Sequence, residues 1–233
     1  MRWVSVSAAI AFTLLAGTLF VAWWVAPVAQ CDAGCLSQKI FYFHVPSAYA
    51  MYVAVGACVV GSIGYLTTRT SGWDSLAQAG GEVAVLFGAI VLTTGPIWAR
   101  KAWGHYWVWD PRLTTMLLAT LVFVAYLSLR SSDAGEAERR FSAALAILGA
   151  MILPVIHYSV QLWRGQHPTV ITRRGGGLDP VMARTLGLAM LSFTVLVGVL
   201  VAWRARTAWL EARLEAMRTE ATTLGLLGEE GSG

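Results

Sequence analysis

The sequence predicts an all-α integral membrane protein that folds as a six-transmembrane-helix bundle. Of its 233 residues, 57% are hydrophobic and only 13% are charged, whereas soluble domains carry roughly a quarter charged residues. Apolar runs of about 20 residues, long enough to cross a hydrocarbon core ~30 Å thick, recur along the whole chain. Turn-forming and polar residues separate these runs, so we expect one compact helical bundle within the bilayer.

We place the six spans at residues 4–28, 40–66, 79–99, 113–129, 141–162 and 181–203. The first run is longer than the apolar region of a secretory signal, which usually has about 7–15 residues, so we interpret it as a span. Residues 1–203 then form the membrane domain, and residues 204–233 form a C-terminal tail. The first part of this tail, Arg204 to Glu220, is charged and compatible with a helix.

The basic residues limit the possible functions. The net charge of +4 is spread along the chain, without the lysine-rich run that indicates nucleic acid binding. Neither Lys39 nor Lys101 precedes Ser or Thr, so the sequence lacks a Gly-Lys-Ser/Thr phosphate loop, and any ATPase would be a separate subunit. With the N-terminus inside, nine Lys and Arg residues lie inside and eight outside. The positive-inside rule therefore leaves the orientation open.

The three cysteines fall into two groups. Cys31 and Cys35 share the first connection, where an exported loop would be oxidising enough to pair them. Their spacing is not that of a Cys-x-x-Cys redox motif, so the sequence leaves a disulfide undecided. Cys58 lies inside the second span, and we expect it to be a small core residue.

Two histidines are predicted to lie at matched depth on one side of the membrane. His44 lies about one turn after the start of the second span, and His157 about one turn before the end of the fifth. Because consecutive spans run in opposite directions, these two ends face the same side. An ionisable side chain inside a span is a functional candidate, although a single histidine can also be structural. Two imidazoles on different helices can ligate haem iron from opposite sides, whereas zinc would lack further ligands.

The connection between the third and fourth spans opens on that same side. Four tryptophans, Trp98, Trp103, Trp107 and Trp109, lie within twelve residues, which exceeds what anchoring at an interface requires. Their rings can line a shelf for a flat apolar ligand, and Gly104 allows close backbone approach. The cations expected to meet carboxylates at the ligand's edge are Arg100, Lys101, Arg112 and Arg164. A porphyrin with two propionates meets all these demands, and a quinone meets only the apolar one.

Three motifs resemble a known family. Trp103-Gly104-His105-Tyr106-Trp107-Val108-Trp109-Asp110 is similar to the WGxxWxWD signature of the haem-handling membrane proteins of cytochrome c maturation. Phe43-His44-Val45-Pro46-Ser47-Ala48, Arg112-Leu113-Thr114-Thr115, and Leu153 to Val160 with Trp163 close behind resemble the haem exporter protein C family, CcmC. The motifs occur in the family's order, and the match covers nearly every span.

The resemblance implies a multi-pass protein of the bacterial inner membrane with both termini cytoplasmic. It assigns His44 and His157 as axial ligands of haem b, and places the tryptophan-rich segment 98–112 at the periplasmic face. The haem-binding set then includes Trp103, Gly104, Trp107, Trp109 and Asp110. It further implies delivery to a periplasmic haem chaperone, whose own histidine bonds covalently to a haem vinyl group. A small single-span accessory subunit, an ABC transporter ATPase and permease, and membrane lipid complete the expected partners.

Two other functions stay open on the residues alone. A membrane cytochrome b would use the same two histidines for electron transfer and would never release its haem. A transporter permease would use them only for packing, but the spans show few polar residues along a midplane path. His105 falls at a variable position of the signature and His167 lies in the next outer connection, so we assign neither a role.

Overall fold

The computed structural model describes residues 2–29, 35–130, 135–163, 165, 167 and 178–225. Within these ranges it contains helices and no strand. The elements are α1 (Arg2–Phe20), the π-helix η1 (Val21–Val25), the 3-10 helix η3 (Cys35–Ile40), α2 (Phe41–Thr68), α3 (Ser71–Trp103), α4 (Pro111–Ser128), α5 (Glu136–Ala150), α6 (Ile152–Trp163) and α7 (Pro180–Thr223). Six of the resulting stretches are long and apolar enough to cross a membrane, which confirms the predicted fold class.

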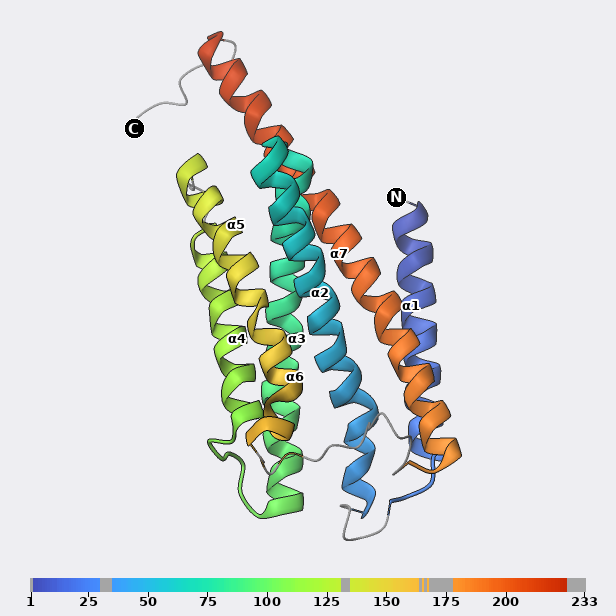
Figure 1. Cartoon of the computed structure of the whole chain (residues 1–233). Coiled ribbons are helices and arrows are strands. Elements are labelled where there is room, and N and C mark those ends of the chain that lie inside the picture. Colours follow the sequence, from blue (N-terminus) through green and yellow to red (C-terminus); the bar gives the residue numbers. More distant parts are fainter. Residues whose placement is uncertain are drawn as a thin grey trace, which may run out of the picture.

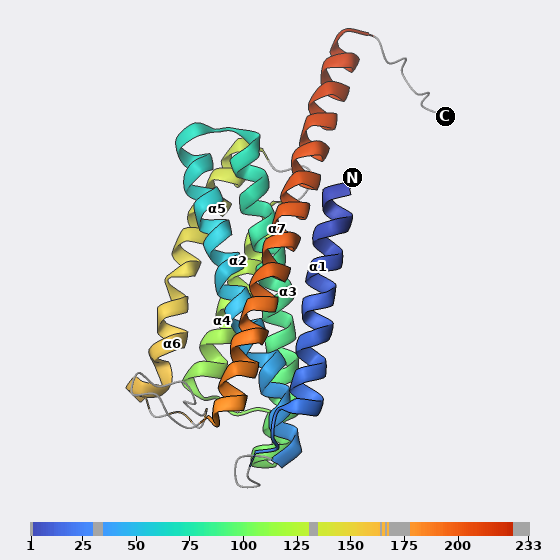
Figure 2. The same cartoon turned by 90° about the vertical axis from the view of Figure 1, so that its right-hand side faces the viewer.

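Two helices extend well beyond the spans expected from hydropathy. α3 begins at Ser71 rather than near residue 79, and α7 continues through residue 203 to Thr223. The fifth span consists of two helices, α5 and α6, which meet at Met151. Figures 1 and 2 show the end of α7 projecting past the rest of the bundle. The charged stretch after the last span therefore continues α7 as a helix.

The bundle is built around the antiparallel pair α2 and α3, with α1 and α7 on one side and α4, α5 and α6 on the other (Figures 1 and 2). Lipid is as apolar as a protein core, so helices in a membrane associate through close packing of small residues. Ala50 and Ala54 of α2 and Ala79 of α3 are fully buried. A Cβ added at Gly80 would lie 2.4 Å from the backbone nitrogen of Cys58. The two central helices are thus in direct backbone contact.

A buried ionic cluster explains the early start of α3. Asp74, in the first turn of α3, pairs with Arg130 after α4 (Nη2–Oδ1 2.7 Å) and with Arg139 of α5 (Nη1–Oδ2 2.9 Å). Burial lowers the pKa of Arg130, but Tyr126 and Asp74 outweigh this effect and hold the pKa above its ordinary value. Because the carboxylate is neutralised, a hydrophilic first turn can pack inside the bundle.

At the opposite end of the bundle, Lys39 joins the first two spans. Its ammonium group donates hydrogen bonds to the carbonyls of Ala22 (3.0 Å), Trp23 (2.6 Å) and Ala26 (2.9 Å). All three N–H donors are used, and the residue is only 8% exposed. A cation at a helix C-terminus satisfies the carbonyls that the helix leaves unpaired and interacts favourably with the helix dipole. Lys39 therefore caps the first span.

The described cysteines are in two different environments. Cys58 is free and buried in the core, as expected. Cys35, just before α2, is disulfide-bonded. Cys31, the other cysteine of this connection, lies outside the described residues.

Candidate functional site

The three features predicted to converge do lie at one end of the bundle. α2 begins, α6 ends, and the connection between α3 and α4 passes at the lower end of Figure 1. His44 occupies the first turn of α2, and His157 the second half of α6. The helix-direction argument is therefore confirmed for these elements.

The hydrogen bonds around His44 favour one tautomer of its ring. Nδ1 lies 2.8 Å from the hydroxyl oxygen of Thr94 on α3. That hydroxyl donates its only hydrogen to the carbonyl of Ile90, also at 2.8 Å. With that hydrogen on Ile90, the oxygen accepts from His44, and Nδ1 carries the proton. The lone pair is then on Nε2, where a metal-ligating histidine needs it, with the other ring nitrogen held by an outer partner.

The neighbouring Gly95 lets the imidazole approach the backbone of α3. A Cβ built at this position would lie 3.1 Å from Cε1 of His44, which is tighter than an ordinary contact, so a larger residue would push the ring outward. Thr94 and Gly95 were not predicted as site residues. Their signal in the sequence is the run Thr94-Gly95-Pro96, in which Gly95 and Pro96 are helix-weakening residues inside a span.

His157 is held through its backbone, while its side chain is exposed. Its carbonyl accepts a hydrogen bond from Nη2 of Arg112 at the start of α4 (3.1 Å). Its ring lies edge-on to that of Tyr158, with ring centroids 4.9 Å apart. The hydrogen bond from Arg112 thus holds the backbone at His157, while the imidazole stays accessible.

Arg112, expected to meet a ligand carboxylate, is engaged with protein groups. Besides the carbonyl of His157, its Nη1 lies 3.1 Å from Nδ1 of His167, which must accept because a guanidinium only donates. His167, to which the sequence assigned no role, is therefore a second partner of this arginine. The guanidinium connects α4 to the end of α6 and the chain that follows it.

Asp110 strengthens the same connection. It is 6% exposed and is the N-cap of α4: Oδ1 accepts from the backbone N–H of Leu113 at 2.8 Å. Oδ2 accepts from the backbone N–H of His167 at 3.3 Å. An aspartate N-cap followed by Pro111 at the first helical position is a strong helix start. The last residue of the tryptophan-rich signature thus both starts α4 and holds the chain after α6.

The turn into the tryptophan-rich segment is formed at Gly104. Its φ of +83° is in the left-handed region, and its N–H donates to the carbonyl of Arg100 at 3.2 Å, which ends α3. The guanidinium of Arg100 donates to the carbonyl of Gly104 and lies over the ring of Tyr106, 5.8 Å from its centroid. Gly104 is therefore required by the turn itself.

The tryptophans form two edge-to-face pairs. Trp98 and Trp103 have centroids 5.0 Å apart, and Trp107 and Trp109 have centroids 5.6 Å apart. Trp109 is 76% exposed, although indole rings usually bury most of their large apolar surface. The second pair therefore presents an uncovered aromatic face at this end of the molecule.

The remaining predicted residues are less constrained. Lys101 is exposed in the last turn of α3, where a cation also suits the helix dipole. Arg164 lies outside the described residues. Among the residues that the structure describes, no cluster of three or more His, Cys, Asp or Glu side chains could hold a metal ion. A histidine pair here suits a metal that brings its own equatorial ligands, as haem iron does.

Comparison with known proteins identifies the family. The family model described as CcmC, heme exporter protein C, matches residues 1–220. The chain belongs to the heme exporter protein C family. Heme exporter protein C of Bradyrhizobium diazoefficiens is 32% identical over 199 residues, which cover 84% of this chain and 76% of that protein. The Escherichia coli K12 protein of the same name is 32% identical over 172 residues (73% and 69%), and the Rhodobacter capsulatus protein 27% identical over 216 residues (91% and 88%).

Proposed function

We propose that this member of the heme exporter protein C family holds haem b between His44 of α2 and His157 of α6. The family relationship assigns the chain to haem export in cytochrome c maturation, as a multi-pass bacterial membrane protein. Haem is the cargo in this scheme. The protein's own contribution is to bind it, orient it and leave one edge accessible.

The observation that carries the proposal is the state of the His44 ring. With Nδ1–H donated to Thr94 and the Thr94 hydroxyl committed to Ile90, Nε2 presents its lone pair. Outer partners of ligating histidines make the ring more basic and hold its orientation. This arrangement suits His44 to the proposed role of axial ligand.

The second ligand and the apolar wall are both accessible. His157 is exposed, and the neighbouring aromatic residues on α6, Tyr158 and Trp163, are 43% and 58% exposed. Trp109, in the connection at the same end of the bundle, is also exposed, so a porphyrin could bury these rings. A surface left open on one side would protect the iron through its axial ligands while exposing a vinyl edge to a partner.

The charged residues around the site divide into two roles. Arg112 acts on the protein, because its hydrogen bonds to His157 and His167 hold α6 in place. The other cations predicted to meet haem propionates are Arg100, whose guanidinium also donates to the carbonyl of Gly104, together with Lys101 and Arg164. Propionate pairing would orient the porphyrin in its plane and so select which vinyl group faces outward.

The position of the termini supports the proposed orientation. α1 starts and α7 ends at the end of the bundle opposite the tryptophan-rich connection (Figure 1). If that connection is periplasmic, both termini are cytoplasmic. The haem would then be presented to a periplasmic haem chaperone, with a single-span accessory subunit and the ABC transporter ATPase and permease as further partners.

Haem retention by single variants tests the proposal. His44→Ala and His157→Ala should each lower the haem content of detergent-purified protein, whereas the control His105→Ala should retain it. Incubation of the loaded protein with a purified periplasmic haem chaperone should then give a covalent haem adduct on the chaperone. A haem that cycles with quinol but never transfers would favour a cytochrome b, and failure of the wild-type protein to bind added haem would favour a permease.

A further inference from the structure

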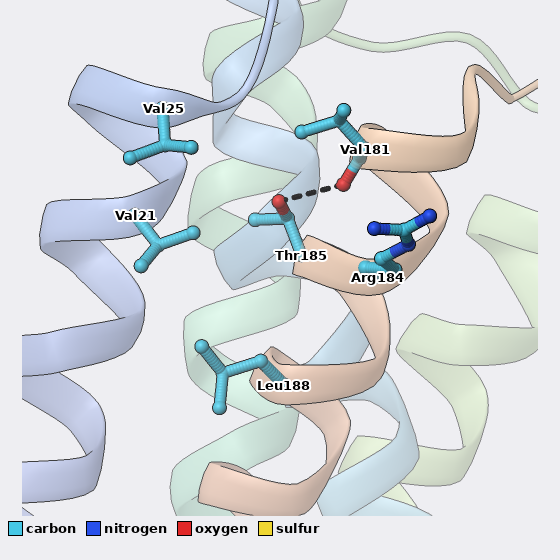
Figure 3. A pocket seen from close by; sticks show the side chains of 6 residues that line it. All are labelled: Val21, Val25, Val181, Arg184, Thr185 and Leu188. Atoms are coloured by element: carbon cyan, nitrogen blue, oxygen red, sulfur yellow. Dashed lines mark hydrogen bonds between the residues drawn. The ribbon is translucent and has the colours of Figure 1, made fainter.

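A separate cavity of about 360 Å³ lies between the first span and α7. Figure 3 shows the side chains that line it: Val21 and Val25 from η1, and Val181, Arg184, Thr185 and Leu188 from α7. None of these residues belongs to the histidine site, which is built from α2, α3, α4 and α6. Both η1 and the start of α7 lie at the same end of the bundle as that site (Figure 1).

Beside the cavity, the first span ends in a π-helical turn. The N–H of Ala26 bonds to the carbonyl of Val21 at 2.9 Å, five residues back along the chain. In such a wide turn, residues four apart lie on nearly the same face, so Val21 and Val25 point together toward α7 (Figure 3). One turn earlier, α1 packs closely on α7, and a buried hydrogen bond of 2.6 Å joins Thr18 to Ser192.

Lys39 makes this widened turn a fixed feature. Its three hydrogen bonds are to carbonyls at both ends of the π-helical turn, Ala22, Trp23 and Ala26. The cavity wall is therefore held by a buried ammonium group rather than by packing alone.

The lining combines an aliphatic wall with one cation. The α7 residues are spaced i, i+3, i+4 and i+7, so they form a single face of the helix. The hydroxyl of Thr185 donates to the carbonyl of Val181 at 2.8 Å, so it is satisfied within the helix (Figure 3). Arg184, one turn after the start of α7, is the charged residue of the lining.

We propose that this cavity binds a phospholipid, with its phosphate on Arg184 and an acyl chain along Val21, Val25 and Leu188. The chain spans the membrane, so phospholipid surrounds it, and the end of a span is the depth at which phosphates lie. A guanidinium matches phosphate oxygens in a bidentate geometry. The lining offers no histidine or cysteine, and therefore no ligand for haem iron.

Native mass spectrometry of the full chain in mild detergent tests this proposal with phosphatidylglycerol as the probe. We expect one tightly retained phosphatidylglycerol in the wild type. Arg184→Gln should weaken its binding about tenfold, the loss expected for a charge-assisted hydrogen bond. The matched control is Arg218→Gln, which removes the same charge from an exposed position near the far end of α7 and should bind like the wild type.

A second variant keeps the charge and fills the cavity. Val21→Phe should lower lipid retention while Arg184 is intact, so the proposal stays testable even if Arg184→Gln folds poorly. Equal retention by Arg184→Gln and Arg218→Gln would overturn the assignment. So would displacement of the lipid by millimolar inorganic phosphate, which would indicate a free-anion site, or a retained mass equal to haem.

Discussion

The tautomer of His44 gives a sharp prediction about Thr94. Thr94→Val removes the hydroxyl that accepts from Nδ1 but keeps the size and branching of the side chain. One hydrogen bond is lost, which is worth about 1 kcal/mol and predicts a fivefold loss of haem affinity. The loss of ring orientation adds to this, since mutation of outer partners of metal ligands typically costs about 10- to 100-fold. We therefore expect haem to bind about tenfold more weakly.

The neighbouring Thr93 provides a matched control. Its hydroxyl makes the same kind of bond to the helix, to the carbonyl of Ala89 at 2.8 Å, but it is exposed and does not contact His44. Titration of detergent-purified protein with haem, followed by absorption, should give a weakened Kd for Thr94→Val and an unchanged one for Thr93→Val. Thr94→Ser, which restores the hydroxyl, should recover most of the affinity. Wild-type affinity in Thr94→Val would refute the assignment of a fixed tautomer.

The other predictions concern the two ends of the bundle and the tryptophan face. Lys39→Met leaves three carbonyls, two of them buried, without their donor and should lower the free energy of unfolding by about 3 kcal/mol, measured by thermal unfolding in detergent. Asp74→Asn leaves the buried Arg130 without its anion and should cost about 3–5 kcal/mol by the same assay. Trp109→Ala should keep haem bound by the histidines but slow its transfer to the chaperone, measured as covalent adduct formed per minute.

Each of these has an outcome that would contradict it. Wild-type thermal stability in Lys39→Met would show that the three hydrogen bonds contribute little. For the ionic cluster, Glu136→Gln breaks an exposed pair with Arg140 and should cost under about 1 kcal/mol, so equal losses in both variants would argue against burial as the cause. Unchanged transfer by Trp109→Ala would remove the proposed role of the exposed face.

The positions of the spans could be predicted because a membrane requires long apolar helices. Their true ends could not, because they depend on contacts between helices. The first turn of α3 contains Asp74, so the sequence predicts a polar connection there. Its pairing with Arg130 and Arg139 is visible only in the structure. Likewise, α7 continues past residue 203 where Arg204 pairs with Glu82 of α3 and Glu211 of α7.

Some residues of the candidate site could likewise be predicted from the sequence, and others could not. His44 and His157 were predictable, since helix direction alone brings their ends together. Thr94 was not, because it is 50 residues from His44 in the chain and acts through one hydrogen bond. The contacts of Arg112 also depended on geometry: its pairing with a ligand carboxylate stays a prediction, and the sequence could not show that its nitrogens bond to His157 and His167.

The most direct test of the two-histidine site is the absorption spectrum of the haem-loaded protein, wild type and single variants. Two imidazole ligands predict a low-spin, six-coordinate haem in the wild type. His44→Ala and His157→Ala should each give a high-spin, five-coordinate spectrum, and the double variant should bind no haem. A low-spin spectrum that persists in either single variant would contradict ligation by that histidine.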